Sequence, residues 1–202
     1  MMIGAIGETS LEVARPMIER WHYSHRVPTG QNIFFVWRVP TVAGLAADML
    51  GDALYAVACY GIGVNPYQAA FLAREYGYEV ETEQLVELKR LCRVEPKVDA
   101  YPLTHFLAQC HRALRVRGYR VVVSFSDPAH SHTGGIYRAA NFQHRGQTQA
   151  EFHLQGEDGE VRHRRFAFRY ARRNGVPTAQ AREELGLERI ETPPKDRWVL
   201  SL

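Results

Sequence analysis

Cysteine is scarce in this chain of 202 residues. Cys59, Cys92 and Cys110 are odd in number, widely spaced and set in apolar segments. Paired cysteines would indicate a disulfide framework and closely spaced ones a zinc motif, and neither pattern is present. We therefore expect three reduced residues in the protein core.

Long apolar runs are also missing. The longest, "VVVSF" and "ALYAVACYGIG", fall well short of the roughly 20 apolar residues of a membrane-spanning helix. The N-terminus lacks a basic region followed by a long apolar stretch. We expect a cytoplasmic protein without a membrane partner. Its ordinary composition predicts a single domain over residues 1–202, with 174–202 as a C-terminal extension packed on it.

Lysine is absent from residues 112–173, where arginine is abundant. From Arg112 to Arg173 there are twelve arginines against five acidic residues, which gives this segment a net charge of +7. The rest of the chain has −4, so that the whole chain has +3. Such an excess is typical of a surface that faces phosphates, but an ordinary solvated surface also fits. Charge alone leaves both interpretations open.

Several nucleotide and hydrolase motifs do not occur. The sequence has no G-x-G-x-x-G, no P-loop and no G-x-S-x-G. A Rossmann dinucleotide site, a kinase-like phosphate loop and a serine hydrolase are therefore poorly supported.

The hydrophobic pattern predicts an α+β fold with α/β character, in which a central mixed sheet is flanked by helices. A strand, a helix ending near Gly118 and a fully buried strand follow one another between residues 85 and 127, as in a parallel crossover. The expected strands are 32–39, 53–63, 85–94, 119–127 and 196–202, with a hairpin over 151–168. The expected helices begin near 11, 68, 102, 135 and 179.

The strand "LVELKRLCRV" has a further expected property. Val86, Leu88, Cys92 and Val94 share one parity with Arg90, so we predict that all five lie on the same face. A buried arginine needs an anionic partner, which is either an internal carboxylate such as Glu87 or a ligand phosphate.

Polar chemistry is concentrated in "SFSDPAHSHTGGIYRAANFQHRG", directly after the buried strand. Ligands gather at the carboxyl ends of strands in such sheets, so this is the predicted site. Asp127 is either a loop cap or a general base, and Tyr137 either a core aromatic or a proton donor to a leaving thiolate. His130 and His132 are fewer than the three or four ligands of a metal site. In "WHYSHR", His22 is either a core histidine or a base.

Together these segments resemble the Mom family of bacteriophage DNA-modification proteins, which have a GNAT-like acyltransferase fold. The resemblance rests on "WHYSHR", "ELKRLCR", the long polar segment and the closing "KDRWVL", in the family's order. It implies a transferase that adds an acyl or carbamoylmethyl-type group to the exocyclic amino group of adenine in DNA. It also implies a phage or prophage protein that protects DNA from restriction.

The resemblance assigns roles to individual residues. His22, Tyr23, Asp127 and Tyr137 match the family's catalytic positions, and Arg90 matches its strand arginine. We assign cofactor binding to a set made of one arginine and three hydroxyl residues: Arg90, Thr104, Ser124 and Ser126. The cofactor implied is acyl-CoA such as acetyl-CoA, although "VEPKVDAYPLTHFL" replaces the glycine-rich pyrophosphate loop of GNAT proteins.

The implied partner is double-stranded DNA whose target adenine leaves the stack, with Tyr23 and Phe142 able to hold it. Iron is a further cofactor implied by the family, with His22, Asp127, His130 and His132 as the available ligands. We leave metal binding and the oligomeric state open, a homodimer included.

Two other functions compete with DNA modification. One is a GNAT N-acyltransferase acting on a small amine or a protein lysine, which gives the arginine excess no role. The other is a non-catalytic DNA-binding protein, which gives the cluster of titratable groups no role.

Overall fold

The computed structural model describes residues 4–40, 52–63, 65, 67–95 and 102–202. Contacts within the chain gather into two compact units. The main unit consists of Met1–Ser126, Gly134–Gly146 and Arg197–Leu202, and the small unit of Asp127–Thr133 and Gln147–Asp196. A grouping by contacts does not define domains, so the single domain expected from the sequence stays a prediction.

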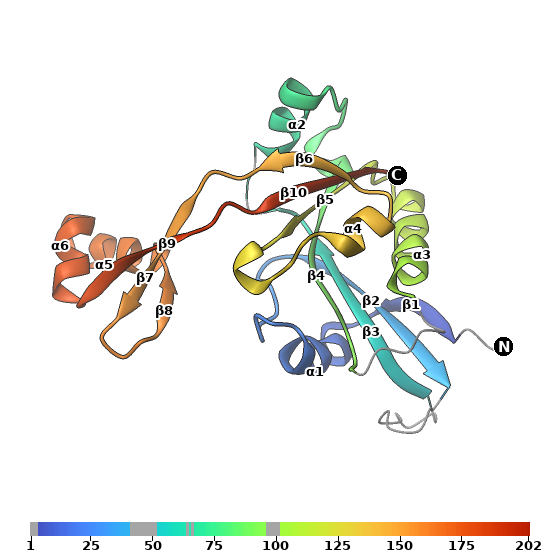
Figure 1. Cartoon of the computed structure of the whole chain (residues 1–202), viewed down its shortest axis with the longest axis horizontal. Helices are drawn as coiled ribbons and strands as arrows, with labels where there is room; N and C mark the ends of the chain where they lie inside the picture. Colours follow the sequence, from blue (N-terminus) through green and yellow to red (C-terminus); the bar gives the residue numbers. More distant parts are fainter. Residues whose placement is uncertain (1–3, 41–51, 64, 66, 96–101) are drawn as a thin grey trace. The chain divides into compact units, whose positions relative to one another are not determined.

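A mixed sheet of seven strands forms the main unit, in the order β1-β2-β3-β4-β5-β10-β6 (Figure 1). Strands β1 to β4 pair antiparallel, whereas β4 and β5 pair parallel with Leu85 opposite Val121. This confirms the predicted α+β fold with a central mixed sheet. The strands are β1 (Ala5–Thr9), β2 (Asn32–Pro40), β3 (Asp52–Gly61), β4 (Leu85–Arg93), β5 (Val121–Ser126), β6 (Gln143–Gln147) and β10 (Asp196–Ser201).

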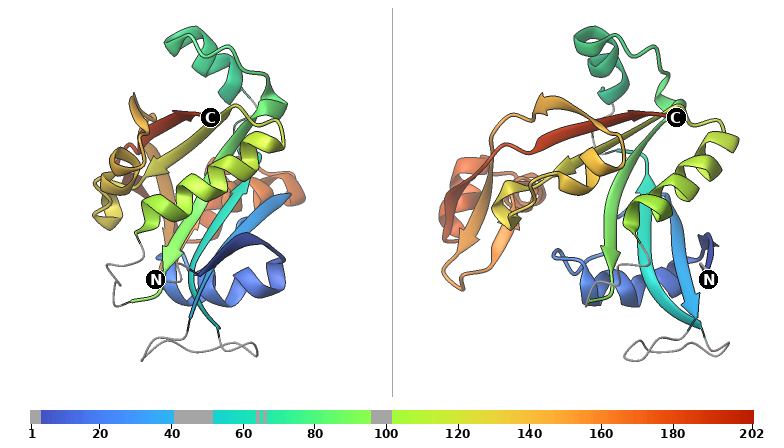
Figure 2. Two further views of the ribbon diagram at one scale, coloured as in Figure 1. Left: turned by 90° about the vertical axis from the view of Figure 1, so that its right-hand side faces the viewer. Right: turned by 45° about the vertical axis from the view of Figure 1, so that its right-hand side comes forward.

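Helices cover both faces of this sheet (Figure 2). Helix α1 (Leu11–Trp21) packs Ala14 and Ile18 against one face, and α3 (Leu103–Val116) packs Phe106 and Leu107 against the other. The apolar stripe of α3 is the one that its sequence predicts, and Gly118 follows its end with a φ of +92°. Two shorter helices, α2 (Gln68–Tyr76) and α4 (Gly135–Ala139), also match the prediction.

The prediction that the even-numbered residues of β4 share one face is wrong. The pairing of β4 with β3 shifts register, since Cys59 lies opposite Arg90 but Tyr60 lies opposite Leu88. This bulge inserts Lys89 and reverses the alternation beyond it. As a result Leu88 belongs to the cluster on the α3 face and Cys92 to the cluster on the α1 face.

The small unit has a three-stranded antiparallel sheet in the order β8-β7-β9. Its elements are β7 (Glu151–Gly156), β8 (Val161–His163), α5 (Arg165–Asn174), α6 (Thr178–Glu184) and β9 (Leu187–Thr192). The predicted hairpin is present, but it ends at His163. Residues 165–168 belong to α5, because Ala167 and Ala171 are buried four residues apart on one helical side.

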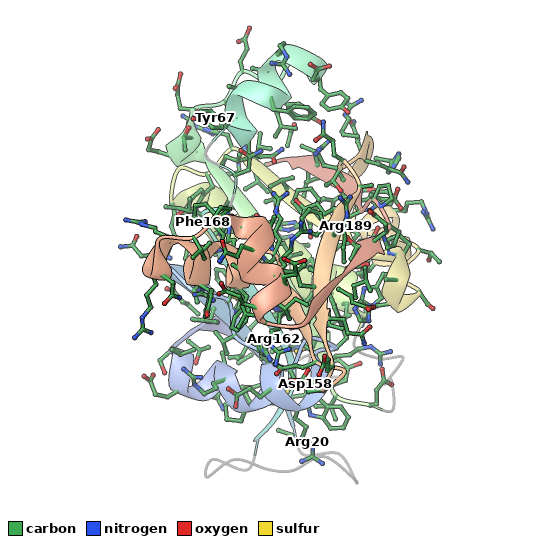
Figure 3. The ribbon with its side chains drawn as sticks, turned by 90° about the vertical axis from the view of Figure 1, so that its left-hand side faces the viewer. Arg20, Tyr67, Asp158, Arg162, Phe168 and Arg189 are labelled. Carbon is green, nitrogen blue, oxygen red and sulfur yellow. The ribbon has the colours of Figure 1, made fainter. Side chains whose placement is uncertain are left out.

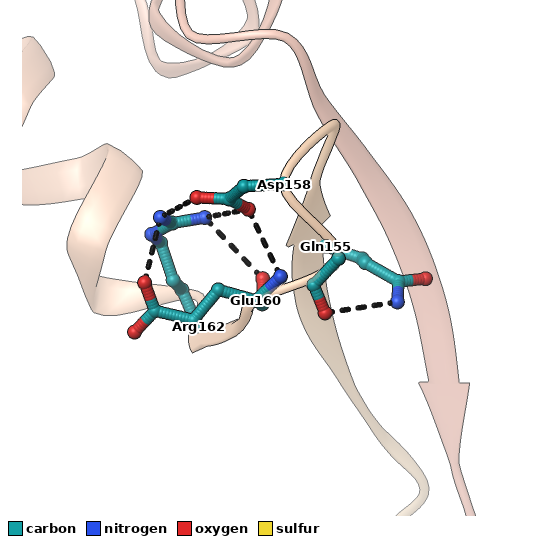
Figure 4. Close-up of polar contacts among 5 residues, drawn as sticks. Gln155, Asp158, Glu160 and Arg162 are labelled. Atoms are coloured by element: carbon teal, nitrogen blue, oxygen red, sulfur yellow. Dashed lines mark hydrogen bonds and ion pairs between the residues drawn. The ribbon is translucent and has the colours of Figure 1, made fainter.

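The hairpin turn is held by its own charges (Figure 4). Arg162 forms ion pairs with Asp158 and with Glu160, and Gln155 Nε2 donates to the Gly159 carbonyl oxygen. Arg162 is therefore neutralised within its own turn.

All three cysteines are buried and free, as predicted. No helix in the described part of the chain is long and apolar enough to span a membrane.

Candidate active site

Tyr137 lies on α4 with its hydroxyl directed at the end of β5. Its Oη is 2.9 Å from Ser124 Oγ and 3.5 Å from the Phe125 carbonyl oxygen. Ser124 is fully buried, and its hydroxyl donates to the Leu88 carbonyl oxygen on β4. The Ser124 hydroxyl also donates to Tyr137 Oη, sharing its single proton between these two acceptors, while Tyr137 Oη donates to the Phe125 carbonyl oxygen.

The surroundings of Tyr137 keep its hydroxyl protonated. Burial raises its pKa above the ordinary value of 10.0, the hydrogen bond from Ser124 lowers it, and the charges of Tyr23 and Glu87 raise it further. The net direction is upward, so at neutral pH Tyr137 is a proton donor. This is the protonation state that its predicted role requires.

Trp198 of β10 completes this part of the main unit. Its Nε1 donates to Ser126 Oγ at 2.9 Å, and its ring stacks on Tyr137 with centroids 5.7 Å apart. Arg138 lies 5.5 Å over the indole, and the ring of His144 contacts the indole edge to face, with centroids 5.1 Å apart. The indole therefore fixes both the tyrosine ring and the end of β5.

Close packing against Trp198 also explains the first glycine of the pair in the polar segment. Gly134 has a φ of +73°, and a Cβ placed on it would lie 2.1 Å from the indole. Only glycine combines this backbone conformation with this approach.

His22 and Tyr23 follow α1 and pack ring against ring with centroids 4.3 Å apart. His22 is buried, and its Nδ1 accepts the backbone N–H of Ser24 at 3.1 Å. The neutral imidazole that makes this contact carries its proton on Nε2. His22 is thus arranged to donate a hydrogen bond, which does not favour it as the base.

The predicted cofactor residues have protein contacts of their own. Arg90 donates to the backbone carbonyls of Arg26 and Lys89, and the hydroxyls of Ser124 and Ser126 have the partners given above. Their binding of a cofactor stays a prediction. The replaced pyrophosphate loop cannot be compared, since residues 96–101 lie outside the described part of the chain.

Thr104 lies in a groove of about 500 Å³ beside α3. Arg112 and Arg115 contribute positive charge to its lining, and His111 contributes a buried Nε2 atom without a hydrogen-bond partner. Burial lowers the pKa of His111 to about 4, so the ring is neutral. The two guanidinium groups in its lining make this groove suited to an anionic ligand such as one that carries phosphates.

Asp127 has its contacts within the small unit. Its Oδ1 accepts the backbone N–H of Ala129 at 3.1 Å, which is the cap expected for an Asp-Pro turn. Its Oδ2 is 2.9 Å from Lys195 Nζ. Burial raises the pKa of this carboxyl, but the hydrogen bond and charge of Lys195 lower it, with a net direction below 3.8. Asp127 is therefore ionised at neutral pH, and its role as base stays a prediction.

The residues available for iron do not form a metal centre. Among the described residues, no three histidine, cysteine or acidic side chains come together. The rings of His130 and His132 are 6.2 Å apart, and Lys195 already pairs with the Asp127 carboxylate. The donor set does not fit a metal ion, and we derive no step through one.

Sequence reasoning did not assign a role to Lys195, Trp198 or His111. The first two lie in the closing "KDRWVL" segment, which supports the family resemblance but does not by itself indicate a function for its residues. His111 lies between Leu107 and Leu114 on the apolar stripe of α3, and this spacing was the available signal.

The sequence matches the model of the Mom protein family over residues 4–201. The chain belongs to the Mom protein family. The resemblance inferred from the motifs is thereby confirmed over nearly the whole chain. No curated protein matches the sequence.

Several solved structures similar to this Mom family member are described as acetyltransferases. The Bacillus subtilis acetyltransferase in complex with CoA has a TM-score of 0.47 and 10% identity, over 98% of this chain and 97% of that chain. The ribosomal-protein-S18-alanine N-acetyltransferase from Escherichia coli has a TM-score of 0.44 and 11% identity, over 98% and 92%. The ribosomal-protein-alanine N-acetyltransferase from Brucella melitensis has a TM-score of 0.48 and 11% identity, over 98% and 99%.

Proposed function

We propose that this Mom family member is a transferase that adds an acyl or carbamoylmethyl-type group to the exocyclic amino group of adenine in double-stranded DNA. Family membership over residues 4–201 supports the class of reaction. The single observation that carries the proposed mechanism is the buried Tyr137 hydroxyl, held protonated at the end of β5. In a phage or prophage host this reaction would protect DNA from restriction.

The chemistry assigns one proton to Tyr137. Bound acyl-CoA would supply the acyl group as a thioester, with Thr104, Arg112 and Arg115 able to hold its phosphate-bearing part. Tyr137 Oη holds a proton that it can pass to a departing thiolate, and Ser124 orients that hydroxyl. Because Ser124 is itself hydrogen-bonded to the Leu88 carbonyl oxygen of β4, it holds the Tyr137 hydroxyl in one orientation.

The proton of the amino group needs an acceptor. An adenine amino group is a poor nucleophile, since its lone pair is delocalised into the ring, and loss of its proton must accompany bond formation. Asp127 is our proposed acceptor because it is ionised, whereas the tautomer of His22 leaves no free acceptor nitrogen facing away from Ser24.

The test of the proposed function is mass spectrometry of nucleosides from plasmid DNA of cells that express the protein. We expect a new adenosine species whose mass identifies the added group. The Tyr137→Phe variant keeps the ring packing on Trp198 but loses the proton, so its modification should fall by about 100-fold or more.

Tyr60→Phe is the matched control for this variant. It also removes one buried hydroxyl from the main unit, and that hydroxyl interacts with the Cys110 thiol. Modification should persist in this variant. Unmodified DNA from cells that hold soluble, folded wild-type protein would instead favour an acyltransferase for a small amine or a protein lysine.

Asp127→Asn separates the base from the cap. The amide oxygen can still accept the Ala129 N–H, whereas the negative charge is lost. We expect modification to be abolished while the variant still unfolds cooperatively. Full modification by Asp127→Asn would leave Asp127 with a structural role only.

A further inference from the structure

Helix α5 of the small unit presents a face made of arginine. Arg165, Arg169 and Arg172 are exposed and recur at spacings of four and three, so they share one side of the helix. Phe168 lies between them in the same stripe and exposes 56% of its surface. The opposite side packs through Ala167 and Ala171. The helix thus has an alanine side for the unit's core and an arginine side for solvent.

Acidic partners do not neutralise this stripe. Helix α5 contains no aspartate or glutamate, and within the described residues Arg165, Arg169 and Arg172 form no ion pair. Arg162 of the preceding hairpin is the contrast, because Asp158 and Glu160 hold it (Figure 4). Three like charges at helical spacing repel one another, and this repulsion is relieved when an anion binds.

A hollow of about 420 Å³ lies beside this face, and two of its arginines, Arg164 and Arg189, are ion-paired with Glu151 and Glu191. It is lined by four arginines and two phenylalanines, among other residues: Arg164, Arg165, Arg182, Arg189, Phe152 and Phe168. Figure 3 shows Phe168 on α5 and Arg189 on β9 within the small unit. The guanidinium of Arg189 lies 4.3 Å from the centroid of Phe152. Guanidinium groups beside aromatic rings suit a ligand that combines phosphates with flat bases.

We propose that the α5 stripe and this hollow form the surface through which the small unit holds the phosphodiester backbone of DNA. This inference rests on the proposed function, which makes DNA the substrate. Arginine forks match phosphate oxygens with two hydrogen bonds at once, and successive turns of a helix repeat them along the strand. An anionic lipid surface shares the charge but would bury more apolar side chains than the single aromatic of this stripe.

The test variant replaces Arg165, Arg169 and Arg172 with glutamine. Glutamine preserves helix propensity, and all three positions are exposed, so the fold should persist. The control variant replaces Arg15, Arg20 and Arg74 of the main unit with glutamine and so removes the same charge. Arg15 and Arg74 are already paired with Glu19 and Glu75.

Binding of a fluorescein-labelled duplex is measured by anisotropy over a series of salt concentrations. Each lost phosphate contact should lower the slope of log K against log salt by about 1, so the test variant should lose about 3. Its affinity near 0.1 M salt should fall by about 10- to 100-fold. The control variant should retain the wild-type slope.

The other outcomes distinguish failure of the proposed surface from failure of the proposed function. If the test variant keeps the wild-type affinity and slope while the wild type modifies adenine, the proposed DNA-binding surface is wrong and the proposed function is retained. Binding to phosphatidylglycerol vesicles but not to the duplex assigns the stripe to a membrane. Salt-sensitive duplex binding that requires the stripe, without any modified adenosine, supports the surface and removes the proposed function.

Discussion

The pKa values of single residues in this protein are shifted by burial and by neighbouring charges. Tyr137 stays protonated because its hydroxyl is buried beside Ser124, and Asp127 stays ionised because Lys195 outweighs its burial. The sequence could identify both as chemical candidates from their place after a buried strand. Their states depend on neighbours such as Lys195, which is distant in the chain, so no local pattern could supply them.

His111 provides a measurable case of the same effect. Its folded pKa of about 4 lies below the ordinary 6.5, so the unfolded chain binds the proton more tightly between these values. Folding stability should therefore be complete above pH 6.5 and fall as the pH drops toward 4, by about 3 kcal/mol from this residue. Urea unfolding at several pH values should show a flatter dependence for His111→Leu. Parallel curves for the two proteins would mean that the ring is accessible to protons when folded.

At the scale of elements, the predicted secondary structure was confirmed where the hydrophobic pattern of a helix or strand continues without interruption. The stripe of α3 and the uninterrupted apolar run of β5 are both present as expected. The bulge at Lys89 was not predictable, because alternation in the sequence continues through it while the pairing with β3 shifts. Similarly, the alternating "RFAF" was expected to be a strand, and only packing of Ala167 and Ala171 shows that it begins α5.

The start of α4 gives a prediction about glycine. Gly134→Ala combines a left-handed backbone with a clash against Trp198, so we expect a loss of about 2–4 kcal/mol in stability. Gly118→Ala is the matched control, since its φ is +92° but nothing lies within 4 Å of a Cβ there. It should lose only about 1–2 kcal/mol. Chemical denaturation of both variants measures the difference, and equal losses would show that the indole moves aside.

At the scale of the whole molecule, the division into two units was not visible in the sequence. The small unit joins Asp127–Thr133 with Gln147–Asp196, whereas the expectation separated residues 174–202 as an extension. Strand β10 comes from residues 174–202 and lies between β5 and β6. A pattern of apolar residues gives the type of an element but not its partners, so this grouping required the structure.

The two units should unfold in separate steps. The main unit has three apolar clusters, but three of the small unit's four buried apolar residues are alanines, which contribute little buried area. All three tryptophans, Trp21, Trp37 and Trp198, lie in the main unit. In a urea titration the far-ultraviolet circular dichroism should therefore begin to change before the tryptophan emission does. Coincident curves would show that the units unfold as one.

The position of β10 also has a consequence during translation. The ribosome makes β5, α4 and β6 before it makes Trp198, whose indole binds Ser126 and stacks on Tyr137. Until that tryptophan has left the exit tunnel, the nascent chain lacks the strand that lies between β5 and β6. The catalytic tyrosine proposed here would thus gain its final setting only after synthesis is complete.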